Sequence, residues 1–364
     1  MRSTSPNAKV FNPAWLRAAA PLLALVLSAC ATPTHRPEAP PAGLQALEQE
    51  RQQAIALSSQ QQALSRLNRV AWPLQRAAAE LCPKPAEASL GIRLGNRYFF
   101  SEGLRPSALR MLQAGDVLQV LDVVPDSPAQ QQGVMRGDHL IRLEGNDLPV
   151  AERATTELRP LLDQLQPQQA VKLQLMRDGQ SHLVTLTPAA LCRYPVVLLH
   201  SDSINAYADH RSIQITRGML GFAGNDWDLA FVIAHELAHN LLSHVPATFR
   251  NGAIGGVVDL WLLASGVPSP GLMALAGSRA YSQAFEAEAD YVALYLMARA
   301  GLPLDQDSNY WRRIAAWRQS GITPDTSATH PDTSRRYLLM QQTLAEIRHK
   351  QTNELPLLPG APGI

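Results

Sequence analysis

Two histidines and a glutamate stand out within the apolar stretch AFVIAHELAHNLLSH. His235 and His239 are four residues apart, and Glu236 directly follows the first histidine. On a helix, side chains at i and i+4 share a face about 5–6 Å apart, so two imidazoles can bind one metal ion. A catalytic zinc site needs a third protein ligand and a position open to water. The spacing predicts one zinc ion per chain with Glu236 as the general base; a hydrogen-bonded pair of core histidines is the alternative.

The third ligand is expected downstream, in the segment SQAFEAEADYVALYLMARAG at residues 282–301. Glu286 and Asp290 are at i and i+4 on the expected helix, whereas Glu288 lies about 160° away and should face solvent or pair elsewhere. We expect Glu286 to bind zinc and Asp290 to accept a hydrogen bond from the second ring nitrogen of a zinc-binding histidine. The alternative is an ordinary helix whose carboxylates are solvated.

His244 is a nearer candidate, because it follows His239 by five residues. An uninterrupted helix would rotate it about 140° away from His239. We therefore expect His244 to cap the helix end, where a cationic side chain meets the last carbonyl groups.

Two helices must hold these residues, one around residues 229–242 and one over 282–301 that should end at Gly301. Between them, the apolar run at 253–277 is interrupted by Asp259 and two prolines, so neither half reaches the ~20 residues needed to cross a membrane. We expect this run to pack as core beside the two helices; a membrane-facing hairpin is the alternative.

Four segments together resemble the gluzincin peptidases that include HtpX and the CAAX prenyl proteases, in particular their soluble secreted relatives. They are HELAH (235–239), EAEAD (286–290), NAYA (205–208) and THPDTSRR (329–336). The resemblance covers about residues 195–345. It implies an α+β protein in which residues 194–350 form a mainly helical zincin-type metallopeptidase domain with a small edge-exposed sheet.

The resemblance also implies where a polypeptide substrate lies and which further residues act. The substrate is expected along an edge strand formed by Ser212, Ile213, Gln214, Ile215 and Thr216. His330 is expected near the metal cleft in a catalytic role, and Arg336 beside the metal ligands. For His330 the alternative is a surface loop residue that precedes a proline.

Short runs with alternating hydrophobicity predict β-strands in the middle of the chain, at 117–124, 139–145, 171–179 and 182–188. The RDGQ sequence between the last two predicts a hairpin turn. Residues 86–190 resemble a PDZ domain, through the segment VVPDSPAQQQGVMRGDHLIRLEGNDL at 123–148. The resemblance implies a groove that binds an extended peptide or a C-terminus by strand addition. Residues 97–106, expected to hold the ligand carboxylate, lack a short glycine loop; a PDZ fold used only as a spacer or regulator is the alternative.

The N-terminus has the pattern of a targeting segment. Basic residues precede a short apolar run at 18–29, which predicts a secretory signal peptide over residues 1–29. The sequence LSAC resembles the lipobox of bacterial lipoproteins, which implies that Cys30 carries the lipid that attaches the chain to a membrane. In that family Ala31 implies the periplasmic face of the outer membrane; anchoring to the inner membrane, or an ordinary signal peptide, is the alternative.

The remaining segments link or flank the expected domains. Residues 30–43 predict a Pro-rich tether, and residues 44–82 predict one or two helices that Pro73 should kink or break. Residues 351–364 form a polar, Pro-rich tail. Secretion would allow Cys82 and Cys192 to form a disulfide at the base of the PDZ region; two buried free thiols are the alternative.

Composition narrows the functional class. The chain has 46% hydrophobic residues, and its 32 Lys+Arg nearly balance 31 Asp+Glu, so no broad basic field points to nucleic acid. We expect a zinc endopeptidase that acts on misfolded or unassembled proteins of the bacterial envelope. The alternative is a periplasmic chaperone or adaptor with gated or minor proteolytic activity.

Overall fold

The computed structural model describes a mixed α+β fold, as the sequence predicts. The described residues are 38–192, 194–244, 282–304, 310–317 and 334–360, with the single positions Ala247, Ala253, Val257, Asp259, Leu260 and Leu263. The expected signal peptide, the lipidation site Cys30, most of the tether and the expected catalytic residue His330 lie outside the described residues. The chain divides into two compact units, residues 1–49 and residues 50–364.

Helix α2 is long and continues through a proline. It spans Ala42–Ala77 and is followed by the short 3₁₀ helix η1, Ala79–Leu81. The helix break that was one expectation for Pro73 is not observed, because Pro73 lies inside α2. An interior proline costs about 3 kcal/mol, but Leu67, Val70 and Leu74 are buried around it, and each such side chain contributes about 1.5–3 kcal/mol. Packing therefore offsets the proline.

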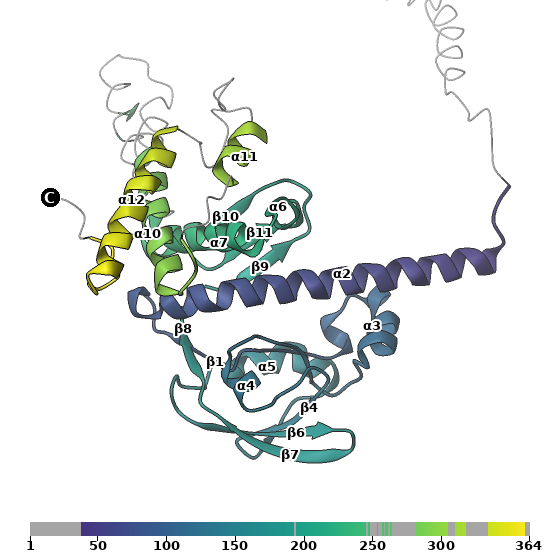
Figure 1. The fold of residues 1–364 in the computed structure, drawn as a ribbon. Coiled ribbons are helices and arrows are strands. Elements are labelled where there is room, and N and C mark those ends of the chain that lie inside the picture. Colours follow the sequence, from purple (N-terminus) through teal and green to yellow (C-terminus); the bar gives the residue numbers. More distant parts are fainter. Residues whose placement is uncertain are drawn as a thin grey trace, which may run out of the picture. The chain divides into compact units, whose positions relative to one another are not determined.

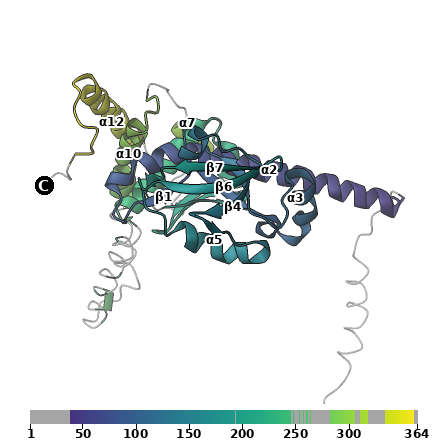
Figure 2. The ribbon, with the colours of Figure 1, turned by 90° about the horizontal axis from the view of Figure 1, so that it is seen from below.

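The region with the PDZ resemblance is a six-stranded sheet with strand order β2-β3-β4-β6-β7, in which β5 pairs with β4. Helix α5 packs against it in a shared hydrophobic cluster that includes Leu158, Leu173 and Leu186, and Figure 2 shows this helix beside the strands. The bounds are β1 Glu87–Ser89, β2 Ile92–Gly95, η2 Arg97–Phe99, η3 Glu102–Leu104, α3 Arg105–Leu112, β3 Gln119–Val123, α4 Pro128–Gln131, β4 His139–Leu143, β5 Asn146–Asp147, η4 Ala151–Arg153, α5 Ala154–Leu162, β6 Val171–Arg177, β7 Gln180–Leu186 and β8 Ala189–Leu191.

The predicted hairpin is confirmed. Strands β6 and β7 pair in antiparallel register from Val171 opposite Leu186 to Arg177 opposite Gln180, and they form a long ribbon in Figure 1. Asp178 and Gly179 at its tip have φ of 50° and 75°. Positive φ at both central residues is what a two-residue type I′ turn requires.

Residues 97–106, expected to hold a ligand carboxylate, follow the edge strand β2. They form the 3₁₀ helices η2 and η3 and the start of α3 and not a loop before that strand, and their expected role stays a prediction. The turn before β2 instead contains Gly91, whose φ is +75° and whose missing Cβ would lie 2.1 Å from Cβ of Ser127. Only glycine fits this backbone position. Strand β2 is too short to show a periodic pattern, which is why the sequence did not locate it.

A disulfide joins Cys82 and Cys192 across the base of this region, as predicted, with their Cα atoms 5.5 Å apart. Next to it, β1 pairs with β8 antiparallel, with Glu87 opposite Leu191. The covalent bond and the two-stranded pairing together clasp the point where this region leaves and rejoins the rest of the chain.

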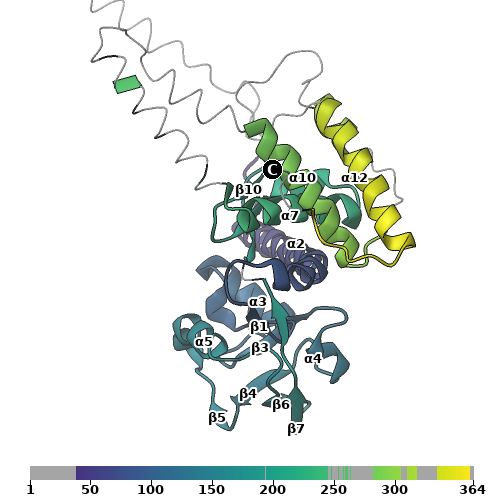
Figure 3. The ribbon, with the colours of Figure 1, turned by 90° about the vertical axis from the view of Figure 1, so that its left-hand side faces the viewer.

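The C-terminal region places helices around a small sheet. Its sheet has the order β10-β11-β9, and helices α10 and α12 lie side by side, as Figure 3 shows. The bounds are β9 Val196–Leu199, β10 Ala206–Ala208, β11 Ile213–Thr216, α6 Arg217–Phe222, α7 Asp226–Leu241, α10 Ser282–Arg299, α11 Tyr310–Trp317 and α12 Ser334–Thr352.

The prediction that residues Ser212 to Thr216 form an edge strand is wrong. Residues Ile213–Thr216 form β11, which pairs with β10 on one side and β9 on the other. Backbone groups on both sides of β11 are therefore engaged in the sheet. Among the described strands, β10 lies at one edge of this sheet, and it also contacts α7. The NAYA segment therefore contains the edge strand rather than preceding it.

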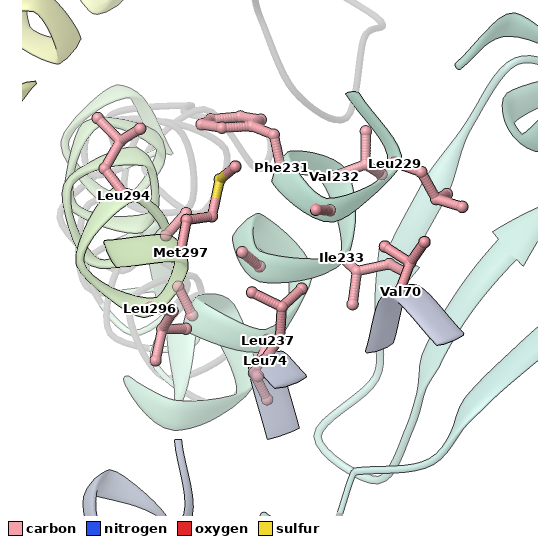
Figure 4. Packing of buried hydrophobic residues seen from close by; sticks show 14 of the residues in the cluster. Val70, Leu74, Leu229, Phe231, Val232, Ile233, Leu237, Leu294, Leu296 and Met297 are labelled. Carbon is pink, nitrogen blue, oxygen red and sulfur yellow. The ribbon is translucent and has the colours of Figure 1, made fainter. Parts of the chain in front are cut away.

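Helices α7, α10 and α2 share one hydrophobic core. Figure 4 shows Phe231 and Leu237 of α7 with Leu296 and Met297 of α10, and Leu74 of α2 beside them. All five side chains are at most 1% exposed. Burying side chains of this size contributes about 1.5–3 kcal/mol each, so the two helices that carry the site residues are held rigidly.

The apolar run at 253–277 lies mostly outside the described residues. At three described positions, Val257, Leu260 and Leu263, the exposed fractions are 67%, 68% and 63%. The expectation of core packing is wrong at these three positions, which are spaced three residues apart and are all exposed. No helix within the described part of the chain is long and apolar enough to cross a membrane.

Candidate metal centre

Helix α7 carries the HExxH residues in the interior of the fold. The side chain of Asn225 caps its start by accepting a hydrogen bond from the backbone N–H of Asp228 at 2.8 Å. His235, Glu236 and His239 are 4%, 2% and 7% exposed. Because α7 is buried on nearly all sides, these polar side chains must be compensated by other polar groups or by an ion.

Helix α10 supplies the third group at the predicted position. Glu286 places Oε2 3.3 Å from Nε2 of His235 and Oε1 3.3 Å from Nε2 of His239. The two Nε2 atoms are 3.1 Å apart. Tetrahedral bonds of about 2.0–2.1 Å to zinc require ligand atoms roughly 3.3 Å from one another. The two nitrogens and the carboxylate therefore have both the chemistry and the spacing that zinc requires, and they can hold one ion.

Asp290 and Arg336 lie beside two of these three groups, His235 and Glu286, as predicted. Asp290 Oδ1 lies 2.9 Å from Nδ1 of His235. Arg336 donates to both oxygens of Asp290, at 2.7 and 2.8 Å, and Nη1 of Arg336 lies 2.9 Å from Glu286 Oε2. The Arg336 guanidinium also lies over the ring of Trp311, 4.4 Å from its centroid. Arg336 thus orients both carboxylates from within the core.

The charges at this site favour a cation. The carboxylates of Glu236, Glu286 and Asp290 are all buried, and the buried guanidinium of Arg336 pairs with the last two of them. Burial opposes ionisation of Asp290, but Arg336 and His235 hold its pKa below the usual value. Burial also disfavours a charged His235, yet Asp290 and Glu286 raise the pKa of this imidazole to about 10. Positive charge at His235, between Glu286 and Asp290, is therefore stabilised.

The position of His244 also differs from the one that the sequence predicted. Helix α7 ends at Leu241, and Ser243 has a left-handed φ of 57°, so the chain turns back toward the helix. His244 is 4% exposed, with Nδ1 2.9 Å from Nδ1 of His239. Burial lowers the pKa of His244 to about 3, so it is not a cationic cap. The rotation of about 140° assumed an uninterrupted helix, which ends before this residue.

A pocket beside Glu236 connects the site to the sheet edge. Its lining includes Asn205 and Ala206 at β10, His235 and Glu236 of α7, and Trp311 of α11. The sequence predicted neither the presence of Trp311 at the site nor the role of His244. Contacts between elements far apart in the sequence bring both residues to the site, and the residues next to them in the sequence do not indicate this.

Residues 174–343 match the model of peptidase family M48. This chain contains an M48 peptidase domain. The resemblance to the HtpX and CAAX proteases is confirmed at the level of this family, and residues 88–187 match the PDZ domain model. The M48 domain contains all the described site residues, His235, Glu236, His239, Glu286, Asp290 and Arg336.

Similar proteins match this chain over part of their length. The beta-barrel assembly-enhancing protease of Escherichia coli K12 is 25% identical over 181 residues, which cover 44% of this chain and 35% of that protein. The mitochondrial metalloendopeptidase OMA1 of Saccharomyces cerevisiae is 29% identical over 142 residues, 36% of this chain and 40% of that protein. This chain therefore spans well under half of these relatives.

A solved structure similar to this chain is the HtrA3 PDZ domain bound to a phage-derived ligand. It is 22% identical, with a TM-score of 0.22, and the match covers 29% of this chain and 88% of that one.

Proposed function

We propose that this chain is a zinc-dependent endopeptidase that hydrolyses peptide bonds of misfolded or unassembled proteins of the bacterial envelope. One observation carries the proposal: His235, His239 and Glu286 offer three ligand atoms that all lie within 4.8 Å of one another, in the interior of the fold. Glu236 follows the first ligand on the same helix, and the pocket beside it reaches the sheet edge at β10. The M48 match and the two peptidase relatives support this assignment.

His235, His239 and Glu286 would hold one zinc ion. Zinc in such a site supplies Lewis-acid chemistry, which polarises a carbonyl group and lowers the pKa of a water molecule. Glu236 accepts the proton of the attacking water and then passes it to the leaving amine nitrogen. Asp290 holds His235 with Nε2 toward the ligand site, and Arg336 holds Asp290 and Glu286 in place. His330 remains a proposed catalytic residue.

The substrate would lie extended along β10. Among the described strands, Ala206–Ala208 pairs only with β11, so its other edge can accept a peptide backbone. Its first residue, Ala206, lines the pocket beside Glu236. A peptide added as a further strand would therefore pass the general base. This placement replaces the substrate strand first expected at residues 212–216.

The other modules would bring the peptidase to its clients. The PDZ domain would bind a client peptide or C-terminus, or regulate access to the cleft. A lipid on Cys30 would attach the chain to the periplasmic face of the outer membrane. The name of the Escherichia coli relative, a beta-barrel assembly-enhancing protease, supports an envelope setting.

The test is Glu236→Gln, which keeps the shape of the side chain and removes the base. We expect the variant to retain stoichiometric zinc and to lose cleavage of an unfolded protein by at least about 100-fold, within the usual range for a positioned general base. Glu152→Gln, at an exposed position of the PDZ region, is the matched control and should cleave normally. Undiminished cleavage by Glu236→Gln would show that the assignment is wrong.

The PDZ domain favours a second candidate, a chaperone or adaptor that binds clients and cleaves them rarely. The same variant separates the two. If Glu236→Gln fully complements a deletion strain, binding of clients is the working activity. If it does not complement the strain, hydrolysis is the working activity.

A further inference from the structure

A line of three side chains leads from the candidate metal site toward solvent. His239 Nδ1 lies 2.9 Å from Nδ1 of His244, and Nε2 of His244 lies 3.1 Å from Oε2 of Glu288. The two histidines are 7% and 4% exposed, whereas the Glu288 side chain is 41% exposed. Glu288 lies on α10 between Glu286 and Asp290, so the same helix approaches both histidines of the HExxH motif.

The directions of these hydrogen bonds follow from the chemistry of imidazole. A histidine that binds a metal through Nε2 is neutral and carries its proton on Nδ1. His239 Nδ1 must then donate, so Nδ1 of His244 must accept. A neutral His244 that accepts at Nδ1 carries its proton on Nε2, and this N–H donates to the carboxylate of Glu288. In this arrangement every donor in the line has an acceptor, and Nε2 of His239 keeps its lone pair for the metal.

Two features hold His244 in this position. The left-handed backbone at Ser243 turns the chain after α7. The imidazole stacks on Phe285, with ring centroids 4.4 Å apart and an interplanar angle of 17°. His244 contacts His239 through Nδ1 of both rings, whereas Nε2 of His239 faces Glu286. His244 can therefore support His239 as a ligand, but it does not reach the ligand site itself.

We propose that His244 is a positioning residue for the metal site, which together with Glu288 fixes the tautomer and ring orientation of His239. It would act on His239 as Asp290 acts on His235, so each histidine of the HExxH motif would have its own support from α10. The inference rests on the proposed zinc function, because it assigns a role toward that ion.

The test measures zinc affinity of the full-length protein by competition with a chelator, and the absorption spectrum of the cobalt-substituted protein. His244→Phe keeps the ring that stacks on Phe285 but removes both hydrogen bonds. We expect it to weaken zinc binding about 10- to 100-fold and to shift the cobalt spectrum. His244→Asn keeps an acceptor near Nδ1 and should recover affinity to within about threefold of the unaltered chain. His200→Phe, at an exposed histidine, is the matched control and should change neither.

The outcomes separate the two proposals. If the unaltered chain does not bind zinc, the proposed function and this inference both fail. If it binds zinc and His244→Phe binds it equally well, or His244→Asn binds it as weakly as His244→Phe, only the inference fails. Should His244→Phe not fold by circular dichroism, Glu288→Ala decides: weakened zinc binding supports the inference, and unchanged binding overturns it.

Discussion

Asp290 Oδ1 lies 2.9 Å from Nδ1 of His235, while the other nitrogen of that ring faces Glu286 at 3.3 Å. This pairing determines which ring nitrogen is available to a metal. A carboxylate at Nδ1 keeps the proton there and leaves the lone pair of Nε2 pointing at the ligand site. Both carboxylates come from α10, one helical turn apart, so the packing of α10 on α7 builds the ligand set and its support together.

Replacement of Asp290 by Asn should weaken zinc binding about 10- to 100-fold, because the amide no longer provides a charged acceptor for His235. Chelator competition on the purified protein measures this directly. Asp209→Asn, at a carboxylate that accepts a hydrogen bond from the N–H of Ser212 and that contacts none of the three ligands in the described structure, is a control that should bind zinc normally. An unchanged affinity in Asp290→Asn would contradict the assigned role.

Arg336→Gln should destabilise the metal-free protein by about 3–5 kcal/mol, because Asp290 and Glu286 would lose their buried cationic partner. Urea unfolding followed by circular dichroism gives the free energy of unfolding. Arg335 is the adjacent, exposed residue of the same helix, and Arg335→Gln should change stability by less than about 0.5 kcal/mol. Equal effects in the two variants would show that the pairing adds nothing.

Removal of the disulfide in the double variant Cys82→Ser, Cys192→Ser should lower stability by up to about 4–5 kcal/mol. The bond closes a loop with a sequence separation of 110, and the chain-entropy model assigns that much to a loop of this size. Thermal unfolding with and without dithiothreitol measures it. The reductant should lower the melting temperature of the unaltered chain and leave that of the double variant unchanged.

Acid should weaken the PDZ region through Asp138. This carboxylate is 1% exposed; burial opposes its ionisation, but Arg177 and the N–H of Met135 hold its pKa below the usual value. A depressed folded pKa stabilises the protein above the unfolded value of about 3.9, and this stabilisation is lost as pH falls through the folded pKa. Unfolding measured at pH 7, 5 and 3 should show the loss below about pH 4.

Asp138→Asn isolates that contribution. It should cost about 1–3 kcal/mol at pH 7 and should lose less stability than the unaltered chain between pH 5 and pH 3. Asp126→Asn, at an exposed position of the same region, should follow the unaltered chain at every pH. The same acid sensitivity in Asp138→Asn would mean that other groups are responsible.

Local spacing was enough to predict most of the candidate site. His235 and His239, like Glu286 and Asp290, are i and i+4 pairs, and helix geometry alone places each pair on one face. The hairpin at Asp178 and Gly179 is equally local, because two residues determine its turn. These predictions depend on at most one turn of backbone, which is why they required no knowledge of the rest of the fold.

What only the tertiary structure decided involves contacts between distant segments. Residues 212–216 and 206–208 are both suited to strands, and only pairing with β9 makes the first of them central and leaves β10 at the edge. His244 meets His239 because Ser243 takes a left-handed conformation, which serine adopts only where surrounding packing compensates. Strand order and a strained turn depend on the free energy of the whole packed core, so the local pattern of the sequence does not determine them.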